Sequence, residues 1–209
     1  MTKSDKRDDI IRASMELIAE HGFHGAPMAM IAEKAEVGAG TIYRYFENKD
    51  FLINELYREL REKIIATLTA GYSDEKPIRE NFIYLGTTLL KFFISHPLYF
   101  RFLEQYYNSP YGVSLRRDKV LRKSDNRDIF MNLFEQGINR QIMKDLPLSV
   151  HAALAFGPLI ALARDHILGL LELDDSLITK SVEACWDGIK RNGTLMHSNK
   201  TIEVSHADE

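Results

Sequence analysis

The chain has 209 residues, of which 45% are hydrophobic, and a formal net charge of −3, a size and composition typical of a globular protein with one or two domains. No segment approaches the roughly 18 uncharged apolar residues of a membrane span, and the polar first residues differ from a signal peptide. Cys185 is the one cysteine, which excludes an intramolecular disulfide. We therefore expect a cytoplasmic protein without a membrane partner. The thiol of Cys185 is expected to be an inert core group.

The first predicted elements are two short helices. Apolar residues recur at helical spacing over residues 10–19, and Gly22 follows as a stop signal. Asp8 or Asp9 is expected to cap the free amides at the start of this helix. Pro27 is expected to open a second short helix, because the missing N–H of proline is harmless there. The second helix has an apolar face made of Ile31, Ala32 and Ala35.

A glycine-rich turn then leads into a short helix that is both aromatic and basic, over residues 37–49. Two short helices, a turn of about four residues and a third helix form the pattern of a helix-turn-helix. In that pattern the third helix enters the major groove of DNA. We therefore expect DNA binding by residues 37–49.

The positions that carry a family resemblance are spread over four predicted helices: Ile31-Ala32, Ala35, Val37, Gly40-Thr41-Ile42-Tyr43, Tyr45-Phe46 and Lys49. On these positions, residues 10–53 resemble the DNA-binding domain of the TetR family of transcriptional regulators. The resemblance implies a non-enzymatic repressor that binds a palindromic, double-stranded operator as a homodimer. It also implies release by a small hydrophobic effector, with no cofactor and no metal.

Three departures from the family pattern bear on how the operator is read. The family usually has Gly where Glu36 stands, and a Ser N-cap where Gly38 stands. It tends to have Ser or Thr and then a polar residue where this chain has Met28 and Ala29. These last two side chains offer no strong hydrogen bond to a phosphate or a base. The reading of the operator is therefore expected to depend on the third helix.

The candidate DNA-binding residues all lie at or near that helix: Gly38, Ala39, Gly40, Thr41, Tyr43, Arg44, Tyr45 and Lys49. The hydroxyls of Thr41 and Tyr43 can reach phosphates, and the Tyr43 ring can pack on a thymine methyl. Arg44 can bind either a phosphate or a guanine. The small residues allow the helix N-terminus to approach a phosphate closely, while Lys49 would neutralise a phosphate on the flank.

The alternative for aromatic residues at helical spacing is the core. Ile42 and Phe46 are four residues apart and are expected to pack inward on the first two helices. Tyr45 is expected to point outward. Tyr43 fits either role from its spacing alone, and the family resemblance favours DNA.

Charge does not favour DNA binding. Residues 1–50 contain seven Lys or Arg and nine Asp or Glu, a net charge of −2, so the broad basic footprint of many DNA-binding proteins is missing. Binding would need a few cations to face the phosphates while the acids turn away. The cations expected in this role are Lys3, Lys6, Arg7, Arg44 and Lys49.

The remainder of the chain keeps a helical pattern. Helices are expected at about 50–70, 77–95, 97–107, 126–144, 148–171 and 175–191. A turn is expected over 108–112, and a solvated basic face or loop over 113–125. The predicted fold is all-α: an N-terminal three-helix helix-turn-helix DNA-binding domain (1–50), linked by a fourth helix to a C-terminal helical ligand-binding and dimerisation domain (51–192), with a flexible tail (193–209).

The segment 148–171 is apolar on nearly every side, so a helix there must be covered on two sides. One side can face the domain core. With the helix at 175–191, the other side would form a four-helix interface with a second copy. Such a homodimer would place two heads about one DNA turn apart.

The C-terminal helices also hold candidate residues for an effector pocket. The apolar members are Phe82, Leu89, Phe93, Phe102, Tyr106, Phe130, Phe134 and Phe156, with His151, Arg164, Asp165 or His166 supplying polarity. For any single member, an ordinary core position is the favoured interpretation. The set matches many small hydrophobic compounds and identifies none.

Two other classes of function were considered. An all-α metalloenzyme needs Glu-x-x-His pairs on inward helix faces, and the one such spacing, Glu203 to His206, lies in the polar tail. His21 and His24 flank a glycine at a helix end and are expected to be surface residues. A non-specific architectural DNA binder conflicts with the acidic head.

Overall fold

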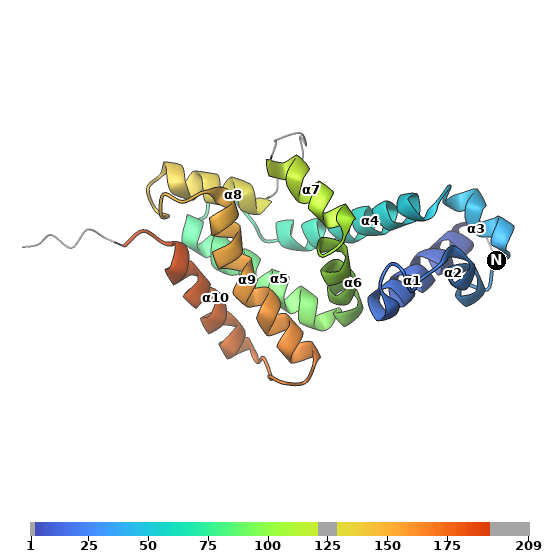
Figure 1. Cartoon of the computed structure of the whole chain (residues 1–209). Helices are drawn as coiled ribbons and strands as arrows, with labels where there is room; N and C mark the ends of the chain where they lie inside the picture. Colours follow the sequence, from blue (N-terminus) through green and yellow to red (C-terminus); the bar gives the residue numbers. More distant parts are fainter. Residues whose placement is uncertain (1–2, 121–128, 193–209) are drawn as a thin grey trace, which may run out of the picture.

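The computed structural model describes residues 3–120 and 129–192, and within these residues every regular element is a helix (Figure 1). The bounds are α1 (Lys3–His21), α2 (Met28–Lys34), α3 (Ala39–Tyr45), α4 (Lys49–Thr69), α5 (Ile78–Ser95), α6 (Pro97–Tyr107), α7 (Pro110–Val120), α8 (Ile129–Asn139), α9 (Leu148–Ile167) and α10 (Asp175–Ile189). The all-α prediction is confirmed. The predicted tail, the Glu203–His206 pair, the start of the helix at 126–144 and the basic residues 122–127 lie outside the described residues.

The helices form a head and a body joined by a long helix. Figure 1 shows α1, α2 and α3 together at one end, and α4 running from them toward the body of α5 to α10. In the body, α5 packs against α9 and α10. The head also rests on the body, because α1 packs along α6. One cluster of buried apolar residues extends from Ile10 in the head to Ile189 in the body.

Side-chain caps fix the starts of two helices that position the head and the C-terminal pair. The Asn48 side chain accepts a hydrogen bond of 2.8 Å from the Phe51 amide at the start of α4. The Asp174 carboxylate accepts one of 2.7 Å from the Leu177 amide at the start of α10. Both satisfy amides that have no partner inside the helix.

The helix starts differ from prediction in two places. α1 begins at Lys3, so Asp8 and Asp9 lie inside the helix, and Asp9 forms a helical i,i+3 ion pair with Arg12 instead of an N-cap. The predicted turn at 108–112 and the loop after it are in part the helix α7. At its start the Gly112 amide donates to the Ser109 hydroxyl at 3.5 Å, and the Val113 amide donates to the Ser109 carbonyl at 3.1 Å.

Two helices end earlier than predicted, and local hydrogen bonds explain both ends. After α8, Gln141 adopts a left-handed conformation (φ 56°), and the Ile142 amide donates back to the Gly137 carbonyl. After α9, Gly169 (φ 72°) does the same, and the Leu170 amide donates to the Asp165 carbonyl. Each is a Schellman motif, which stops a helix by reversing the chain.

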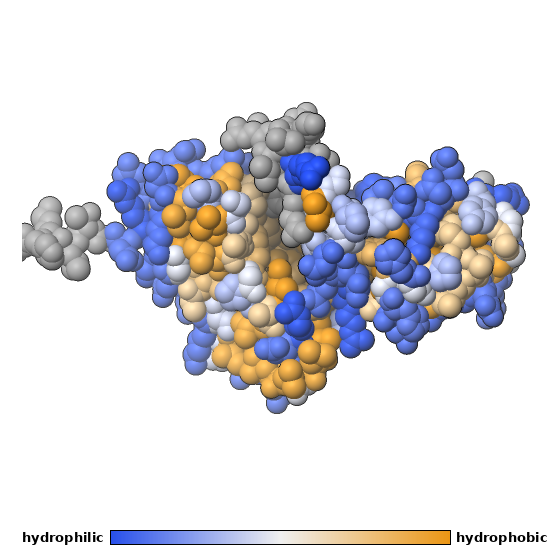
Figure 2. Space-filling view, viewed as in Figure 1, coloured by the Kyte–Doolittle hydropathy of each residue, from blue (hydrophilic) through white to orange (hydrophobic). Residues whose placement is uncertain are grey.

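The helix α9 is covered on one side within the chain. His151, Ala155, Leu159 and Ala163 are buried, while Leu154 is 41% exposed on the other side. Figure 2 shows hydrophobic surface over α9 and the loop that follows it. Contrary to the expectation from sequence, α9 is long and apolar enough to cross a membrane, with 22% of its apolar window buried. Core helices of soluble proteins have the same composition, so this is weak support for a span.

Candidate DNA-binding interface

The position of α3 is set by the turn between α2 and α3. Glu36 adopts a left-handed conformation with φ 53°. Its amide donates to the Glu33 carbonyl at 3.0 Å, and the Val37 amide donates to the Ala32 carbonyl at 2.9 Å. This is a Schellman motif, and its left-handed position is one that glycine adopts without strain.

The start of α3 lacks a side-chain cap. Gly38 occupies the N-cap position in an extended conformation, with φ −66° and ψ 149°. Its carbonyl accepts the Thr41 amide at 2.7 Å. Gly38, Ala39 and Gly40 are exposed, and a Cβ at Gly40 would meet no atom within 4 Å. The first turn of α3 is therefore open to close approach by a phosphate.

The two faces of α3 carry different side chains. Ile42 and Phe46 are 0% and 1% exposed and belong to the core, as predicted. Tyr43 is 55% exposed, Arg44 is exposed, and Thr41 is half-buried. The face that points away from the head is therefore an aromatic and basic one.

Tyr45 does not lie where the sequence placed it. We expected an outward aromatic, whereas the side chain is half-buried and packs against the core cluster. On a helix of 3.6 residues per turn, Tyr45 is adjacent to the inward pair Ile42 and Phe46. The outward aromatic of α3 is Tyr43.

Besides Arg12, which pairs with Asp9, three basic residues of the head are engaged by partners in the protein. The Arg7 guanidinium forms ion pairs with Glu55 at 3.3 Å and Glu59 at 2.6 Å, and its carbon lies 5.6 Å from the centre of the Phe46 ring. It therefore joins α1 to α4, and the charge that was expected to face a phosphate is paired with two carboxylates of the same chain. Lys34 forms a 3.0 Å ion pair with Glu16.

Lys49 is the third. Its ammonium group donates a hydrogen bond to the carbonyl oxygen of Phe23, in the turn after α1. Burial lowers the pKa of Lys49, and the neighbouring Asp50 carboxylate opposes this shift. Lys49 is half-buried, so it ties the start of α4 to the head, and its charge stays near the surface.

An aromatic cluster joins the head to the body. The Phe23 ring lies 6.3 Å from Phe102 of α6 and 5.4 Å from Tyr111 of α7, both in edge-to-face contact. Tyr106 of α6 stacks on Tyr57 of α4 at 4.1 Å. We define Phe23, Tyr57, Phe102, Tyr106 and Tyr111 as the junction cluster.

Sequence analysis did not single out Phe23 or Tyr111. Tyr111 lies among turn residues, and the hydroxyl partner of its side chain, the Asp50 carboxylate, is 61 residues away in the chain. A contact of that separation leaves no periodic signal. The one local sign was an aromatic residue among polar turn residues, which is compatible with many roles.

The predicted effector-pocket residues fall into separate groups. Phe102 and Tyr106 belong to the junction cluster. Phe82 packs on Trp186, and Phe93 on Phe100. Arg164 is exposed and binds Glu104 of α6, with Nε 2.8 Å from the carboxylate.

The remaining aromatic residues of that set, with His151, lie together between α8 and α9. Phe130 meets the Phe156 ring at 4.5 Å, and the His151 ring stacks on Phe134 at 5.5 Å. His151 is fully buried, and its Nε2 donates to the Lys144 carbonyl at 2.9 Å. Its Nδ1 has no hydrogen-bond partner within the described part of the chain.

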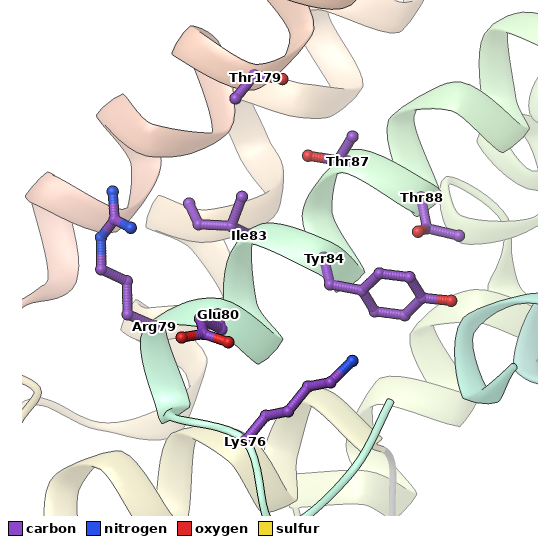
Figure 3. Close-up of a pocket in the computed structure, with 8 residues that line it drawn as sticks. All are labelled: Lys76, Arg79, Glu80, Ile83, Tyr84, Thr87, Thr88 and Thr179. Carbon is purple, nitrogen blue, oxygen red and sulfur yellow. The ribbon is translucent and has the colours of Figure 1, made fainter. Parts of the chain in front are cut away.

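A surface groove of about 430 Å³ lies elsewhere, along the outer side of α5. Figure 3 shows its lining: Lys76, Arg79, Glu80, Ile83, Tyr84, Thr87, Thr88 and Thr179. None of these is a predicted pocket residue. Lys76 lies over the Tyr84 ring at 5.9 Å, and Arg79 is paired with Glu183 at 2.8 Å, so both cations of the groove are already engaged.

Residues that could serve an enzyme are dispersed. Among residues 3–120 and 129–192, no group of three or more His, Cys, Asp or Glu side chains is placed to hold a metal ion. His21 and His24 are both exposed. Cys185 is buried, and burial raises the pKa of its thiol, which disfavours the reactive thiolate.

The head therefore has the geometry of a helix-turn-helix DNA-binding unit: a short helix with one buried and one exposed face, held behind a tight turn. Residues 10–56 match the bacterial regulatory proteins of the tetR family, and residues 77–190, more than half of the chain, match the tetracyclin repressor-like C-terminal domain. The chain belongs to the TetR family of transcriptional regulators, as the sequence predicted, and it is a DNA-binding regulator, not an enzyme.

Relatives that match most of the chain are also transcriptional regulators. An HTH-type transcriptional regulator of Haemophilus influenzae is 25% identical, over 90% of this chain and 98% of that protein. A solved TetR family protein from Vibrio parahaemolyticus is 32% identical, with a TM-score of 0.69 over 90% of this chain and 99% of that one. A TetR family regulator from Marinobacter aquaeolei, 22% identical, has the same fold, with a TM-score of 0.78 over 90% and 97% of the two chains.

Proposed function

We propose that this regulator is a cytoplasmic repressor that binds a palindromic operator as a homodimer. The observation that carries the proposal is the outward side of α9 and α10, which we call the dimer face. It consists of Val150, Ala153, Leu154, Gly157, Pro158 and Ala161 of α9 with Leu177 and Ala184 of α10, all exposed within one chain. An exposed apolar surface of this kind is typical of an interface.

A second copy is the occupant that fits this face best. The face consists of small or aliphatic residues, and a Cβ at Gly157 would meet no atom within 4 Å, so another helix can approach closely. Packing α9 and α10 on their copies makes a self-complementary four-helix interface. This packing also covers the exposed apolar side of α9, so that no membrane is needed to cover it.

The proposal assigns roles to the predicted domains and residues. Residues 1–50 bind the operator, and residues 51–192 dimerise and bind the effector. Tyr43, Arg44, Thr41, Lys49 and the small residues 38–40 face the DNA. Repression is supported by the similarity to the probable acrEF/envCD operon repressor of Escherichia coli, which is 37% identical over 82 residues, 37% of each chain.

The effector in this proposal is a small hydrophobic compound that shifts the dimer away from its DNA-competent state. The aromatic group around His151 supports it, because a neutral imidazole whose Nε2 donates has an acceptor at Nδ1. A buried acceptor without a partner favours a ligand with one hydrogen-bond donor on an apolar frame.

The test of the dimer is Leu154→Arg, with Val113→Arg on α7 as the matched control. Val113 is also an exposed apolar helix residue, 47% exposed, outside the dimer face. Sedimentation should give about twice the 24.0 kDa chain mass for the wild type and the control, and one chain mass for Leu154→Arg. A dimeric Leu154→Arg protein would contradict the proposed interface.

A further inference from the structure

We propose that Tyr111 of α7 is a positioning residue for DNA binding: it bridges the turn after α1 and the first turn of α4, and so sets the angle at which the body holds α3. The inference rests on the proposed role of α3 as the helix that reads DNA. It concerns a body residue that contacts no predicted DNA-binding residue directly.

Tyr111 makes two contacts with the head, of different kinds. Its ring meets the Phe23 ring edge to face, with centres 5.4 Å apart and planes at 61°. Its hydroxyl donates a hydrogen bond to the Asp50 carboxylate. On the body side, the Tyr106 ring stacks on Tyr111, with ring centres 6.1 Å apart. The Tyr111 side chain therefore contacts Phe23 of the head and Tyr106 of the body.

The residue that accepts the Tyr111 hydrogen bond lies close to α3 in the sequence. Asp50 is the second residue of α4, and only Phe46, Glu47 and Asn48 separate α3 from α4. Phe46 is buried in the head core, and the Asn48 side chain caps α4. The start of α4 is therefore held at a fixed distance from the end of α3.

The two head residues that Tyr111 contacts are also joined to each other. Lys49, which precedes Asp50, donates to the carbonyl oxygen of Phe23. Phe23, Lys49 and Asp50 thus form one linked unit, which Tyr111 contacts at the ring of Phe23 and at the carboxylate of Asp50. A displacement of α7 would be carried to α3 through this unit.

The hydrogen bond between Tyr111 and Asp50 restricts the orientation of the head more than the ring contacts do. Phe102 of α6 also packs on Phe23, at 6.3 Å, but ring contacts tolerate sliding. A hydrogen bond weakens steeply as its angle departs from linear. Loss of the Tyr111–Asp50 bond should therefore leave the head attached to the body while widening the range of its orientations.

The experiment separates orientation from general stability by using two DNA probes. One is a duplex that the wild-type protein selects from a random-sequence pool, and the other is a random duplex of equal length. Tyr111→Phe should weaken binding to the selected duplex about fivefold or more. Its affinity for the random duplex should stay within about twofold, because non-specific binding depends on charge and not on head angle.

Two further variants test whether the bond is responsible. Asp50→Ala should lower the ratio of selected to random affinity as Tyr111→Phe does, and the double variant should lower it no further. Asp50→Asn keeps an acceptor and should preserve the ratio. Tyr72→Phe is the matched control, since Tyr72 donates to Asp74 at 2.9 Å beyond the other end of α4, and it should change neither affinity.

An unchanged ratio in Tyr111→Phe overturns the inference, as does an equal loss on both duplexes or additive effects in the double variant. If Tyr111→Phe does not fold, Asp50→Ala decides the question by the same ratio. Tyr43→Ala separates this inference from the function it rests on. If Tyr43→Ala leaves the selected duplex bound as tightly as the wild type does, the role of α3 is wrong; if Tyr43→Ala weakens binding and Tyr111→Phe does not, only the role of Tyr111 is wrong.

Discussion

The ammonium group of Lys49 donates a hydrogen bond to the carbonyl oxygen of Phe23, so the first residue of α4 is tied to the turn that ends α1. From the sequence, Lys49 is expected to neutralise a phosphate. The contact adds a second role, because the same side chain closes the head on itself. A variant at this position should therefore affect folding as well as DNA binding.

Lys49→Ala should weaken operator binding and lower the free energy of unfolding by about 1–2 kcal/mol, since the Phe23 carbonyl loses a charged donor. Urea denaturation measures the second effect and fluorescence anisotropy the first. Lys63→Ala is the control on the same helix. Lys63 is exposed and lies over the Tyr99 ring, away from the head, and its replacement should leave operator binding unchanged.

Neighbouring residues of α3 should respond in opposite ways. Tyr43→Ala should weaken operator binding by about 1–3 kcal/mol, the range of a base-edge contact, while the melting temperature stays the same, because the side chain is 55% exposed. Ile42→Ala should cost about 2–5 kcal/mol of stability, because Ile42 is fully buried. Equal melting temperatures for the two variants would contradict the assignment of the two faces.

The left-handed residue at the end of α2 predicts a stabilising substitution. Glu36→Gly should raise the free energy of unfolding by about 0.5–1 kcal/mol, because glycine adopts φ 53° without strain. Glu33→Gly, three residues earlier in the right-handed helix, should lower it by about 1 kcal/mol. Chemical denaturation of both variants compares the same substitution, Glu to Gly, in a left-handed and in a right-handed backbone. A loss of stability at both positions would argue against strain at Glu36.

These residues show how far the sequence predicted the site. The inward Ile42 and Phe46 followed from helical spacing, which acts within one helix, whereas the outward Tyr43 followed from the family resemblance. The engagement of Arg7 by Glu55 and Glu59 did not follow, because it depends on how α1 packs against α4, about 50 residues away. Spacing predicts a face, whereas tertiary packing decides which charges on that face are already paired.

The body shows the same limit. The helix pattern predicted the starts of α9 and α10 at Leu148 and Asp175, although α9 ends at Ile167, four residues before the predicted end. The helix pattern did not predict α7, because the apolar residues there follow no strong period. Tyr111 holds the first turn of this helix through its contact with Asp50. The predicted pocket set was dispersed for a related reason: aromatic residues on separate helices meet different neighbours.

Stability at high pH should depend on Tyr111. Burial and then the hydrogen bond to Asp50 raise the pKa of Tyr111 to about 12 from its ordinary value of 10.0. In the unfolded chain the phenol ionises near pH 10. The unfolded state therefore loses this proton first, and stability falls as the pH rises from about 10 to about 12.

Below about pH 10 this contribution is fully present, so denaturation midpoints at about pH 9 and about pH 11 bracket the effect. Tyr111→Phe should reduce the difference between the two midpoints. Some difference should remain, because burial also raises the pKa of Tyr57. A difference identical to that of the wild type would show that Tyr111 ionises alike in both states.

The salt dependence of DNA binding should distinguish the paired arginine from the exposed one. Each cation that neutralises a phosphate contributes about 0.9 to the slope of log affinity against log salt concentration. Arg44 is exposed on the outward face of α3, so Arg44→Met should lower the slope by about that amount per head. Arg7→Met should leave the slope unchanged, since Glu55 and Glu59 already neutralise Arg7. Titrations of one duplex over a series of potassium chloride concentrations measure both slopes, and a reduced slope for Arg7→Met would mean that Arg7 exchanges its carboxylate partners for a phosphate when DNA binds.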